Sequence, residues 1–303
     1  MSNLLQELKQ GKILLADGAM GTSLQQRGLQ AGACPESWNL SNPGAVQEII
    51  AAYAAAGSDI VETNSFGGTR YKLQHYGLAD KVKEINRRAA ELARQAVGSA
   101  CYVAGSVGPT GVFIKPLGPA TQEEIYEAFR EQIMALAAGG ADAICIETMM
   151  ALDEAQAALR AARENCSLPV MVTFTFEKTV KAEYRTLMGH LPEQVARQLT
   201  AAGADIIGSN CGGGIEQMVD ICKLMRENTD KFIMIQSNAG LPVLQEGRAV
   251  FKSTPQDMAA RVTELIDGGA NIIGGCCGTT AEHIRAFRKQ LDARTGTWQS
   301  GCQ

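Results

Sequence analysis

Three cysteines stand directly after short apolar runs and beside glycines, a pattern typical of an open zinc site. Cys276 and Cys277 follow the run 270–273 and are flanked by glycines, while Cys211 follows the run 205–210 and precedes three glycines. Thiolates bind Zn²⁺ well, and a catalytic zinc uses three protein ligands and leaves a fourth position for substrate. Successive side chains of a strand point to opposite faces. Cys276 and Cys277 can therefore share one ion only if the strand ends there and the backbone turns, which the glycines permit.

The other cysteines have a simpler interpretation, as small buried hydrophobic residues or as thiols of loops. The first group comprises Cys101, Cys145, Cys166 and Cys222, and the second comprises Cys34 in a loop and Cys302 in the tail. A redox pair at Cys276 and Cys277 is a poor alternative to zinc, because a disulfide between neighbours is strained and redox motifs space their cysteines by two residues. Nine cysteines, an odd number at irregular spacing, predict reduced thiols in a cytoplasmic protein.

The composition excludes several classes of protein. The 303 residues suffice for one large domain or two ordinary ones, and 46% of them are hydrophobic, which is ample for a core. A net charge of −4 offers no basic field for nucleic acid or an anionic membrane surface. No run approaches the 18 apolar residues of a membrane-spanning helix, and the polar N-terminus lacks the apolar core of a signal peptide.

A repeated helix-to-strand junction indicates the architecture. It occurs at 54–64, 137–148, 201–211 and 267–277, each time with glycine before a short apolar strand and a polar or reactive residue after it. Glycine supplies the left-handed residue that ends a helix. Further strands are expected at 13–16, 102–106, 170–174 and 232–236.

Amphipathic helices separate these strands. The segment 122–138 carries one apolar stripe at helical spacing, and Thr121 with Glu124 predicts a capping box at its start. A second helix is expected at 255–266, with Thr254 as its N-cap. Eight strands alternating with helices predict an α/β fold, a single-domain (β/α)₈ TIM barrel over 1–303 with its core at about 12–293, a short N-terminal helix and a C-terminal tail. A doubly wound sheet is the competitor, but it usually has fewer strands and a glycine-rich phosphate turn.

Catalytic residues of such barrels lie at the carboxyl ends of the strands. Cys211 would end the sixth strand and the cysteine pair the eighth, with the seventh strand between them. The three thiols can then converge at the mouth of the barrel. Topology and metal chemistry agree on a zinc site.

Seven segments, taken together, resemble the homocysteine S-methyltransferase family, and most closely the homocysteine-binding barrel of its cobalamin-dependent methionine synthase branch. They read DGAMGT (17–22), NSFGGTRYKL (64–73), GSVGPTG (105–111), IET (146–148), SNCGGG (209–214), SNAGLP (237–242) and GGCCGTTAEHI (274–284). The resemblance implies zinc on Cys211, Cys276 and Cys277. The segment 177–189 is longer than the family's loop after the fifth strand, a loop that can border the substrate.

Homocysteine also carries an ammonium and a carboxylate, for which candidates stand at other strand ends. Glu147 is the first candidate for the ammonium and Asp17 the second. Backbone N–H groups of the glycine-rich turn at 18–22 suit the carboxylate of homocysteine. The other residues expected to bind substrate are Gly18, Ala19, Met20, Thr148 and Asn210. Alternatives remain for both acids, since Asp17 suits a turn and Glu147 an ion pair with Arg70.

Asn238, at the tip of the seventh strand, is expected to cap the zinc before substrate arrives, as the resemblance also suggests. An amide oxygen is a weak neutral ligand that a thiolate can displace. In the alternative interpretation, Asn238 and Asn210 only satisfy loop backbone. The three histidines, including His283 in the last helix, are expected to be structural.

The expected activity is zinc-dependent methyl transfer to the thiol of homocysteine, giving methionine. With no cobalamin-binding domain expected within the 303 residues, the donor would be a methylcorrinoid, presented by a separate corrinoid protein or as methylcobalamin. One alternative is a stand-alone enzyme that uses S-methylmethionine or betaine. Another, from a different class, is a non-catalytic zinc-binding subunit of a corrinoid methyl-transfer complex.

Overall fold

Eight parallel strands form a barrel in the computed structural model, which describes residues 4–245 and 248–295. The strand order is β1-β12-β9-β8-β5-β4-β3-β2, and a bridge between Ala16 and Ile60 joins the first strand of this order to the last. The strands are β1 (Leu14–Leu15), β2 (Ile60–Glu62), β3 (Tyr102–Val107), β4 (Ala143–Met149), β5 (Val170–Phe174), β8 (Ile206–Cys211), β9 (Phe232–Ser237) and β12 (Ile272–Gly275). The predicted (β/α)₈ barrel is confirmed.

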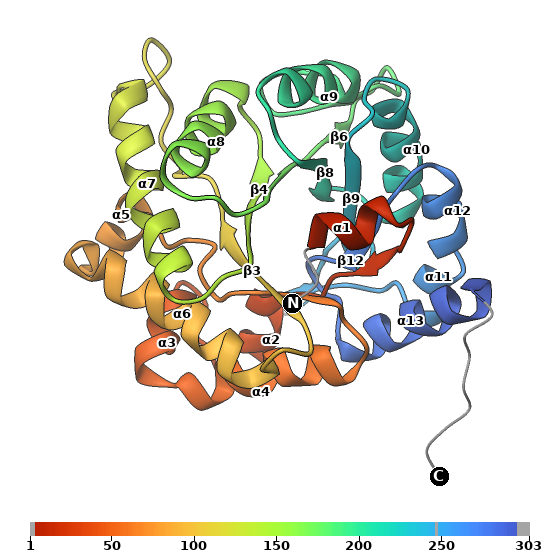
Figure 1. The fold of residues 1–303 in the computed structure, drawn as a ribbon, viewed down its shortest axis with the longest axis horizontal. Coiled ribbons are helices and arrows are strands. Elements are labelled where there is room, and N and C mark those ends of the chain that lie inside the picture. The colour runs from red at the N-terminus through yellow and green to blue at the C-terminus, as the bar shows by residue number, and fades with distance from the viewer. Residues whose placement is uncertain (1–3, 246–247, 296–303) are drawn as a thin grey trace.

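Helices surround the strands as an outer ring (Figure 1). They are α1 (Leu4–Lys9), α2 (Met20–Gln26), α3 (Trp38–Ser41), α4 (Pro43–Ala55), α5 (Arg70–Leu73), α6 (Val82–Val97), α7 (Gln122–Ala138), α8 (Leu152–Asn165), α9 (Pro192–Ala201), α10 (Ile215–Arg226), α11 (Pro255–Ala259), α12 (Val262–Asp267) and α13 (Ala281–Thr295), with 3₁₀ turns η1 (Pro35–Ser37), η2 (Gln74–Tyr76) and η3 (Ala79–Lys81). None of them, within the residues that the structure describes, is long and apolar enough to cross a membrane.

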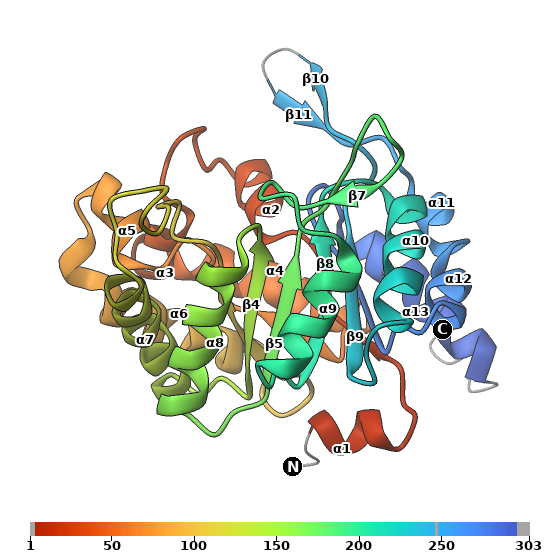
Figure 2. The ribbon, with the colours of Figure 1, turned by 90° about the horizontal axis from the view of Figure 1, so that it is seen from above.

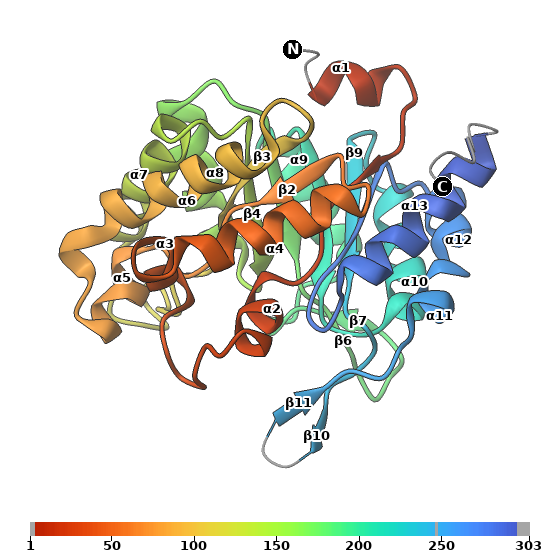
Figure 3. The ribbon, with the colours of Figure 1, turned by 90° about the horizontal axis from the view of Figure 1, so that it is seen from below.

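Two hairpins project from the carboxyl end of the barrel (Figure 2). One joins β6 (Glu177–Lys178) to β7 (Tyr184–Arg185), and the other joins β10 (Val243–Gln245) to β11 (Arg248–Val250). Helix α1 lies at the opposite end, as Figure 3 shows. The mouth that the hairpins border is therefore separate from the end that α1 covers.

The helix signals were largely correct. Helix α7 has the predicted bounds, its stripe of Ile125, Phe129 and Ile133 is buried, and Thr121 and Glu124 form the predicted capping box. Thr254 caps the segment at 255–266 as predicted. The single helix expected there is wrong, however, because α11 and α12 divide it. The N–H of Arg261 bonds the carbonyl of Met258 three residues back, which interrupts the α-helical pattern.

Alternation along the strands builds the barrel interior in layers. Apolar side chains fill the lower layers together with Leu4 and Leu8 of α1, and Cys145 is fully buried among them as predicted. One step nearer the mouth, inward positions become polar. These positions are Glu62 on β2, Ser106 on β3, Glu147 on β4, Thr173 on β5, Asn210 on β8 and Gln236 on β9.

The four repeat junctions have the predicted conformation, with left-handed glycines at Gly57, Gly140, Gly203 and Gly269. The first junction feeds the weakest contact of the barrel, the seam between β1 and β2. There the backbone provides a single bridge and one further hydrogen bond, in which the N–H of Asp59 donates to the carbonyl of Leu15 at 2.7 Å. Side chains complete the seam. A carboxylate oxygen of Asp59 accepts from the N–H of Leu15 at 2.8 Å, and one of Asp17 accepts from the N–H of Glu62 at 2.9 Å.

Candidate active site

The three predicted ligand cysteines meet at the barrel mouth. Cys211 ends β8, Cys276 and Cys277 follow β12, and β9 lies between these strands. Their sulfurs all lie within 4.8 Å of one another, with 3.9 Å between those of Cys211 and Cys277. A tetrahedral zinc with bonds of about 2.3 Å holds its sulfurs about 3.8 Å apart. The spacing of the thiols therefore fits this ion.

Backbone turns bring the sulfurs together. Cys211 and Gly212 are both left-handed, with φ of 61° and 58°. A side chain at Gly212 would also meet the carbonyl oxygen of Phe176 at 2.5 Å, so glycine is required there. Strand β12 ends at Gly275, and the carbonyl of Cys276 accepts from both the N–H and the hydroxyl of Thr279. The predicted strand end and turn at the cysteine pair are confirmed.

Hydrogen bonds among the thiols divide their charge unequally. Hydrogen bonds from Cys276 and Cys277 lower the pKa of Cys211 to about 3. The bond to Cys211 raises the pKa of Cys277 to about 12, and the same thiol contacts raise that of Cys276 well above its ordinary value. The thiol hydrogen bonds therefore favour the thiolate form of Cys211 over those of its two neighbours. A bound cation would deprotonate the others as well, because a metal-coordinated thiol loses its proton.

Asn238 follows β9 and lies buried beside this cluster. Its Nδ2 donates to the carbonyl of Gly212 at 2.9 Å, and its side chain also hydrogen-bonds Cys211. Its Oδ1 is buried and receives no hydrogen bond within the part of the chain that the structure describes. A buried acceptor without a donor suits a metal or a ligand. The amide group of Asn238 thus hydrogen-bonds loop backbone, as the alternative interpretation predicted, and its Oδ1 could still coordinate a metal.

A cavity of about 380 Å³ opens above the thiols. Its lining includes all three cysteines and the predicted residues Gly18, Ala19, Met20, Glu147 and Thr148. The predicted residues Asp17, Asn210 and Asn238 lie outside this lining. The segment 177–189 supplies none of the described residues that line this cavity. It folds instead into the β6–β7 hairpin, where Tyr184 is anchored to Asp220.

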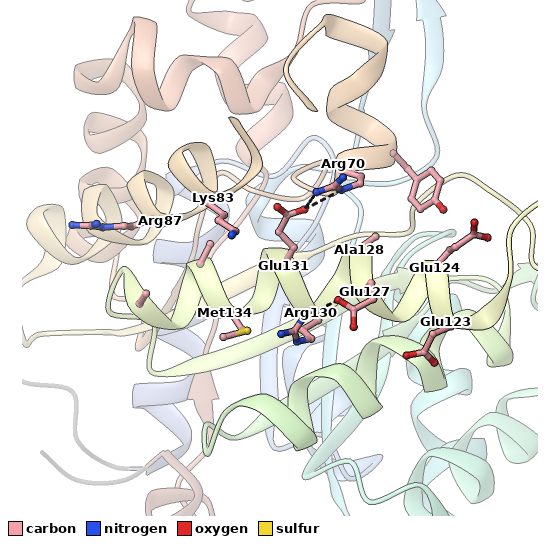
Figure 4. A pocket seen from close by; sticks show the side chains of 13 residues that line it. Arg70, Lys83, Arg87, Glu123, Glu124, Glu127, Ala128, Arg130, Glu131 and Met134 are labelled. Atoms are coloured by element: carbon pink, nitrogen blue, oxygen red, sulfur yellow. Dashed lines mark hydrogen bonds and ion pairs between the residues drawn. The ribbon is translucent and has the colours of Figure 1, made fainter. Parts of the chain in front are cut away.

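Glu147 belongs to a buried network and not to an ion pair with Arg70. It is 7% exposed, accepts from the hydroxyl of Ser106, and accepts from Nδ2 of Asn210 at 3.2 Å. Burial raises the pKa of Glu147 well above its ordinary value, and the charge of Glu62 adds to this. Arg70 pairs with Glu131 at 2.7 Å in a hollow of about 880 Å³ outside the barrel (Figure 4).

Asn210 connects the carboxylate to Thr148, the next residue of β4. Its Oδ1 accepts from the N–H of Thr148 and the hydroxyl of Thr173, both at 2.8 Å, and its Nδ2 also donates to the hydroxyl of Thr148 at 2.7 Å. Thr148 has a left-handed φ of 60°, a conformation that these bonds hold in place. Asn210 therefore orients Glu147 and Thr148 from behind the lining.

Asp17 lies beneath the turn 18–20. It is 2% exposed, its Oδ2 accepts from the N–H of Glu62, and its Oδ1 has no donor among the described residues. Burial raises the pKa of Asp17 to about 7. Helix α2 begins above it at Met20, and Ala19 provides no side-chain cap. The first N–H groups of a helix lack intrahelical acceptors.

The sequence interpretation missed Glu62 and Gln236 as site residues, although both line the cavity. Gln236 donates to Glu62 at 3.1 Å. A signal was present: Glu62 stands two residues after the inward Ile60, as Glu147 stands two after the inward Cys145. Because side chains alternate along a strand, the same two-residue step from an inward residue places both carboxylates on the inner face.

The remaining cysteines mostly behave as expected. Cys101 and Cys222 are buried, and Cys166 is half-buried. Cys34 lies in a loop as expected, where it is buried and donates to Glu36 at 3.3 Å. Cys302 lies outside the described residues. His283 is buried in α13 between Thr280 and the carbonyl of Ser253, a structural position.

Comparison with known proteins identifies relatives of this chain. The model of the family described as homocysteine S-methyltransferase matches residues 14–291. Methionine synthases of Mycobacterium leprae and Mycobacterium tuberculosis are each 33% identical over 94% of this chain, which spans only 24% and 25% of their lengths. The metallated form of the homocysteine methyltransferase MmuM from Escherichia coli has the same fold, with a TM-score of 0.78 and 24% identity over 96% of this chain and 99% of that one. This chain belongs to the homocysteine S-methyltransferase family.

Proposed function

We propose that this protein is a zinc-dependent methyltransferase that moves a methyl group to the thiol of homocysteine and forms methionine. The observation that carries the proposal is the cluster of Cys211, Cys276 and Cys277, three sulfurs at tetrahedral spacing below a cavity. Three thiolates leave one position of a tetrahedral ion open to a fourth ligand. A substrate thiol would occupy that position.

In this proposal the three cysteines hold the zinc, and Oδ1 of Asn238 caps it until substrate arrives. The unpaired amide oxygen beside Cys211 supports this role. When bound, the ion would supply Lewis-acid activation, keeping the substrate sulfur as a thiolate at neutral pH. A free thiol, with a pKa of about 8.5, is mostly protonated and a poor nucleophile there.

The amino-acid end of homocysteine would lie on the opposite side of the cavity. Glu147 would accept the ammonium, with Asp17 as a second carboxylate beneath it. The backbone at the start of α2, at Gly18, Ala19 and Met20, would face the carboxylate. The N–H groups of Gly18 and Met20 would donate to it, because that of Ala19 already donates to Oγ1 of Thr279 at 3.2 Å. Thr148 and Asn210 would fix the position of Glu147 through the bonds described above.

Methyl transfer would then be a direct displacement. The sulfur forms a bond to the methyl carbon, the bond from that carbon to the donor breaks, and its electron pair stays with the donor. The thiol proton leaves before this step. The protein's contribution is to orient the sulfur toward the methyl group, because orientation alone lowers the activation barrier substantially. The enclosed cavity would also exclude other nucleophiles.

For the donor we propose a methylcorrinoid, presented by a separate corrinoid protein or as methylcobalamin. A corrin ring is far larger than a cavity of about 380 Å³ that also holds the amino acid, so it would approach from the mouth. The loops there expose large apolar side chains. These are Phe66 after β2, Phe113 and Leu117 after β3, Leu187 after β7 and Leu241 after β9. Exposed apolar side chains gathered in one region are typical of interaction surfaces.

Parallel assays of the zinc-loaded protein test the donor. Homocysteine would be offered with methylcobalamin, S-methylmethionine or betaine, and methionine would be measured. We expect methylcobalamin to be consumed fastest. Faster turnover with S-methylmethionine or betaine would favour the stand-alone enzyme. Zinc binding without turnover of any donor would favour a non-catalytic subunit of a corrinoid complex.

A further inference from the structure

Two buried acceptor atoms, at the floor of the cavity and behind it, have no donor within the described part of the chain. Oδ1 of Asp17 and Oε1 of Gln236 are both buried, and neither meets a donor among the described residues. Both side chains are 2% exposed. A buried acceptor without a donor is costly unless a ligand or water satisfies it. Gln236 lines the cavity, so its oxygen marks a place for a group that donates, and Asp17 lies behind that lining.

Glu62 is held between these two residues. Its backbone N–H donates to Asp17 at 2.9 Å, and its side chain accepts from Nε2 of Gln236 at 3.1 Å. The thiol of Cys145 also hydrogen-bonds the Glu62 carboxylate from below. Together with Glu147, Glu62 lines the cavity directly. Three strands, β2, β4 and β9, thus place acceptors in the cavity lining.

The charge of this region is not balanced by the protein. The lining contains no lysine, arginine or histidine from the described residues. Burial, reinforced by the charge of Asp17, raises the pKa of Glu62 to about 8. The charge of Glu62 in turn helps raise the pKa of Glu147. Carboxylates that share a buried site disfavour one another's ionised form until a cation joins them. A cationic ligand fits this arrangement.

We propose that Glu62 and Gln236 complete the ammonium-binding end of the cavity, and that they make it selective for thiols that carry an amino group. This inference rests on the proposed function, because it takes homocysteine as the ligand. An alkylammonium has three N–H donors and no acceptor. Glu62 and Gln236 offer it acceptors beyond those of Glu147 and Asp17.

A purely structural role makes a different prediction. The bond across the seam uses the backbone N–H of Glu62, which Glu62→Gln retains. If the side chain only filled space, this substitution would affect every thiol ligand equally. If it meets the ammonium, the effect would be confined to ligands that have one. Two thiols that differ only in the amino group therefore separate the two roles.

The experiment is calorimetric titration of the zinc-loaded protein with L-homocysteine and with 4-mercaptobutanoate, which lacks the ammonium. In Glu62→Gln we expect the Kd of homocysteine to rise about 10- to 100-fold, as for loss of a hydrogen bond to a charged group. The Kd of 4-mercaptobutanoate should stay within about twofold. Gln236→Met should show the same selectivity with a smaller rise, which keeps the test open if Glu62→Gln folds poorly.

Glu154→Gln is the matched control, since Glu154 is a buried carboxylate of α8 that bonds Thr110 outside the cavity. It should leave both Kd values unchanged, and zinc content should stay at one equivalent throughout. Equal losses for the two thiols, or an unchanged Kd for homocysteine, would overturn the inference while the wild type still binds homocysteine. If the wild type bound no homocysteine, the proposed function itself would fail.

Discussion

The two sides of this barrel that carry the site differ in how their strands are joined. On the cysteine side, β8 pairs with β9 from Ile206 to Cys211, and β9 pairs with β12 up to Gly275. We call these three strands the cysteine wall. Across the seam, β1 and β2 share one backbone bridge, and carboxylates of Asp59 and Asp17 accept the neighbouring N–H groups.

The difference matches what each side would bind. A metal needs its ligands held within a few tenths of an ångström, and continuous strands provide that precision. Recognition of an ammonium needs acceptors and negative charge but tolerates more movement, because charge acts over longer distances than coordination. The metal would therefore stand on the cysteine wall, while the amino acid would bind against the seam.

The largest effect should come from breaking the cysteine wall. Cys276→Ala removes one of three thiolates, so zinc content should fall well below one equivalent. Methyl transfer should fall by more than about 100-fold, a loss that changes in outer-shell partners of a metal can already reach. Metal analysis and turnover measure both. Cys222→Ala, a buried thiol outside the cluster, should keep its zinc. A full equivalent of tightly bound zinc in Cys276→Ala would contradict the assignment.

A smaller effect is expected where the substrate's ammonium would bind. Glu147→Gln keeps the size of the side chain but removes its charge and one of its two acceptor oxygens, so homocysteine binding should weaken by about 1.5–3 kcal/mol. Zinc content should not change, because the cysteines are untouched. Calorimetry on the zinc-loaded variant measures the affinity. An unchanged affinity for homocysteine would remove Glu147 from the site.

The seam should show itself in the pH dependence of stability. Burial raises the pKa of Asp17 to about 7 and that of Glu62 to about 8, both above their unfolded values. Between pH 6 and 8 the folded state then binds more protons than the unfolded chain, so the free energy of unfolding falls as pH rises. Asp17→Asn removes one such group and should make this decline shallower, by at most about 1.4 kcal/mol per pH unit.

Denaturant unfolding at pH 6, 7 and 8, without substrate, gives this slope. Asp257→Asn is a suitable control, because hydrogen bonds from Thr254 lower the pKa of Asp257 and it titrates below the measured range. Its unfolding free energies should parallel those of the wild type. Parallel curves for Asp17→Asn as well would show that Asp17 is ionised in both states.

The smallest effect is expected at Asn238. Zinc absorption spectra should show three sulfurs and one light atom without substrate, then four sulfurs with homocysteine. In Asn238→Ala a water would replace the tethered amide, so homocysteine should bind tighter by about 1 kcal/mol or less. Four sulfurs in the substrate-free protein would exclude the cap. An unaltered homocysteine affinity in Asn238→Ala would leave Asn238 as a turn residue.

Local signals in the sequence sufficed for most of the fold. The capping box at Thr121 and the glycines of the four junctions act over a few residues, so the sequence records them directly. The convergence of Cys211 with the cysteine pair was also predictable, because strand order in a barrel follows chain order. The break between α11 and α12 was not predictable. Thr254 signals only the start of a helix, and the apolar pattern after it continues across the break.

The parts that escaped prediction depend on contacts between distant strands. Glu62 has an ordinary place at a strand end, and only the folded barrel brings it beside Gln236, 174 residues later. The pairing of Arg70 with Glu131, which rules out Arg70 as the partner of Glu147, likewise depends on how α5 packs against α7. The alternation along β2 indicates that Glu62 faces inward, but its partner across the barrel has no local sequence signature.

The seam has a consequence for motion. Local opening of a protein starts where few backbone hydrogen bonds protect the chain, and between β1 and β2 one carboxylate of Asp17 holds the amide of Glu62. Amide hydrogens there should exchange with solvent sooner than those of β8 and β9. A ligand whose ammonium rests on both Asp17 and Glu62 would span the gap and slow that exchange. The rate of amide hydrogen exchange would then report whether the cavity is occupied, at backbone positions that the ligand never touches.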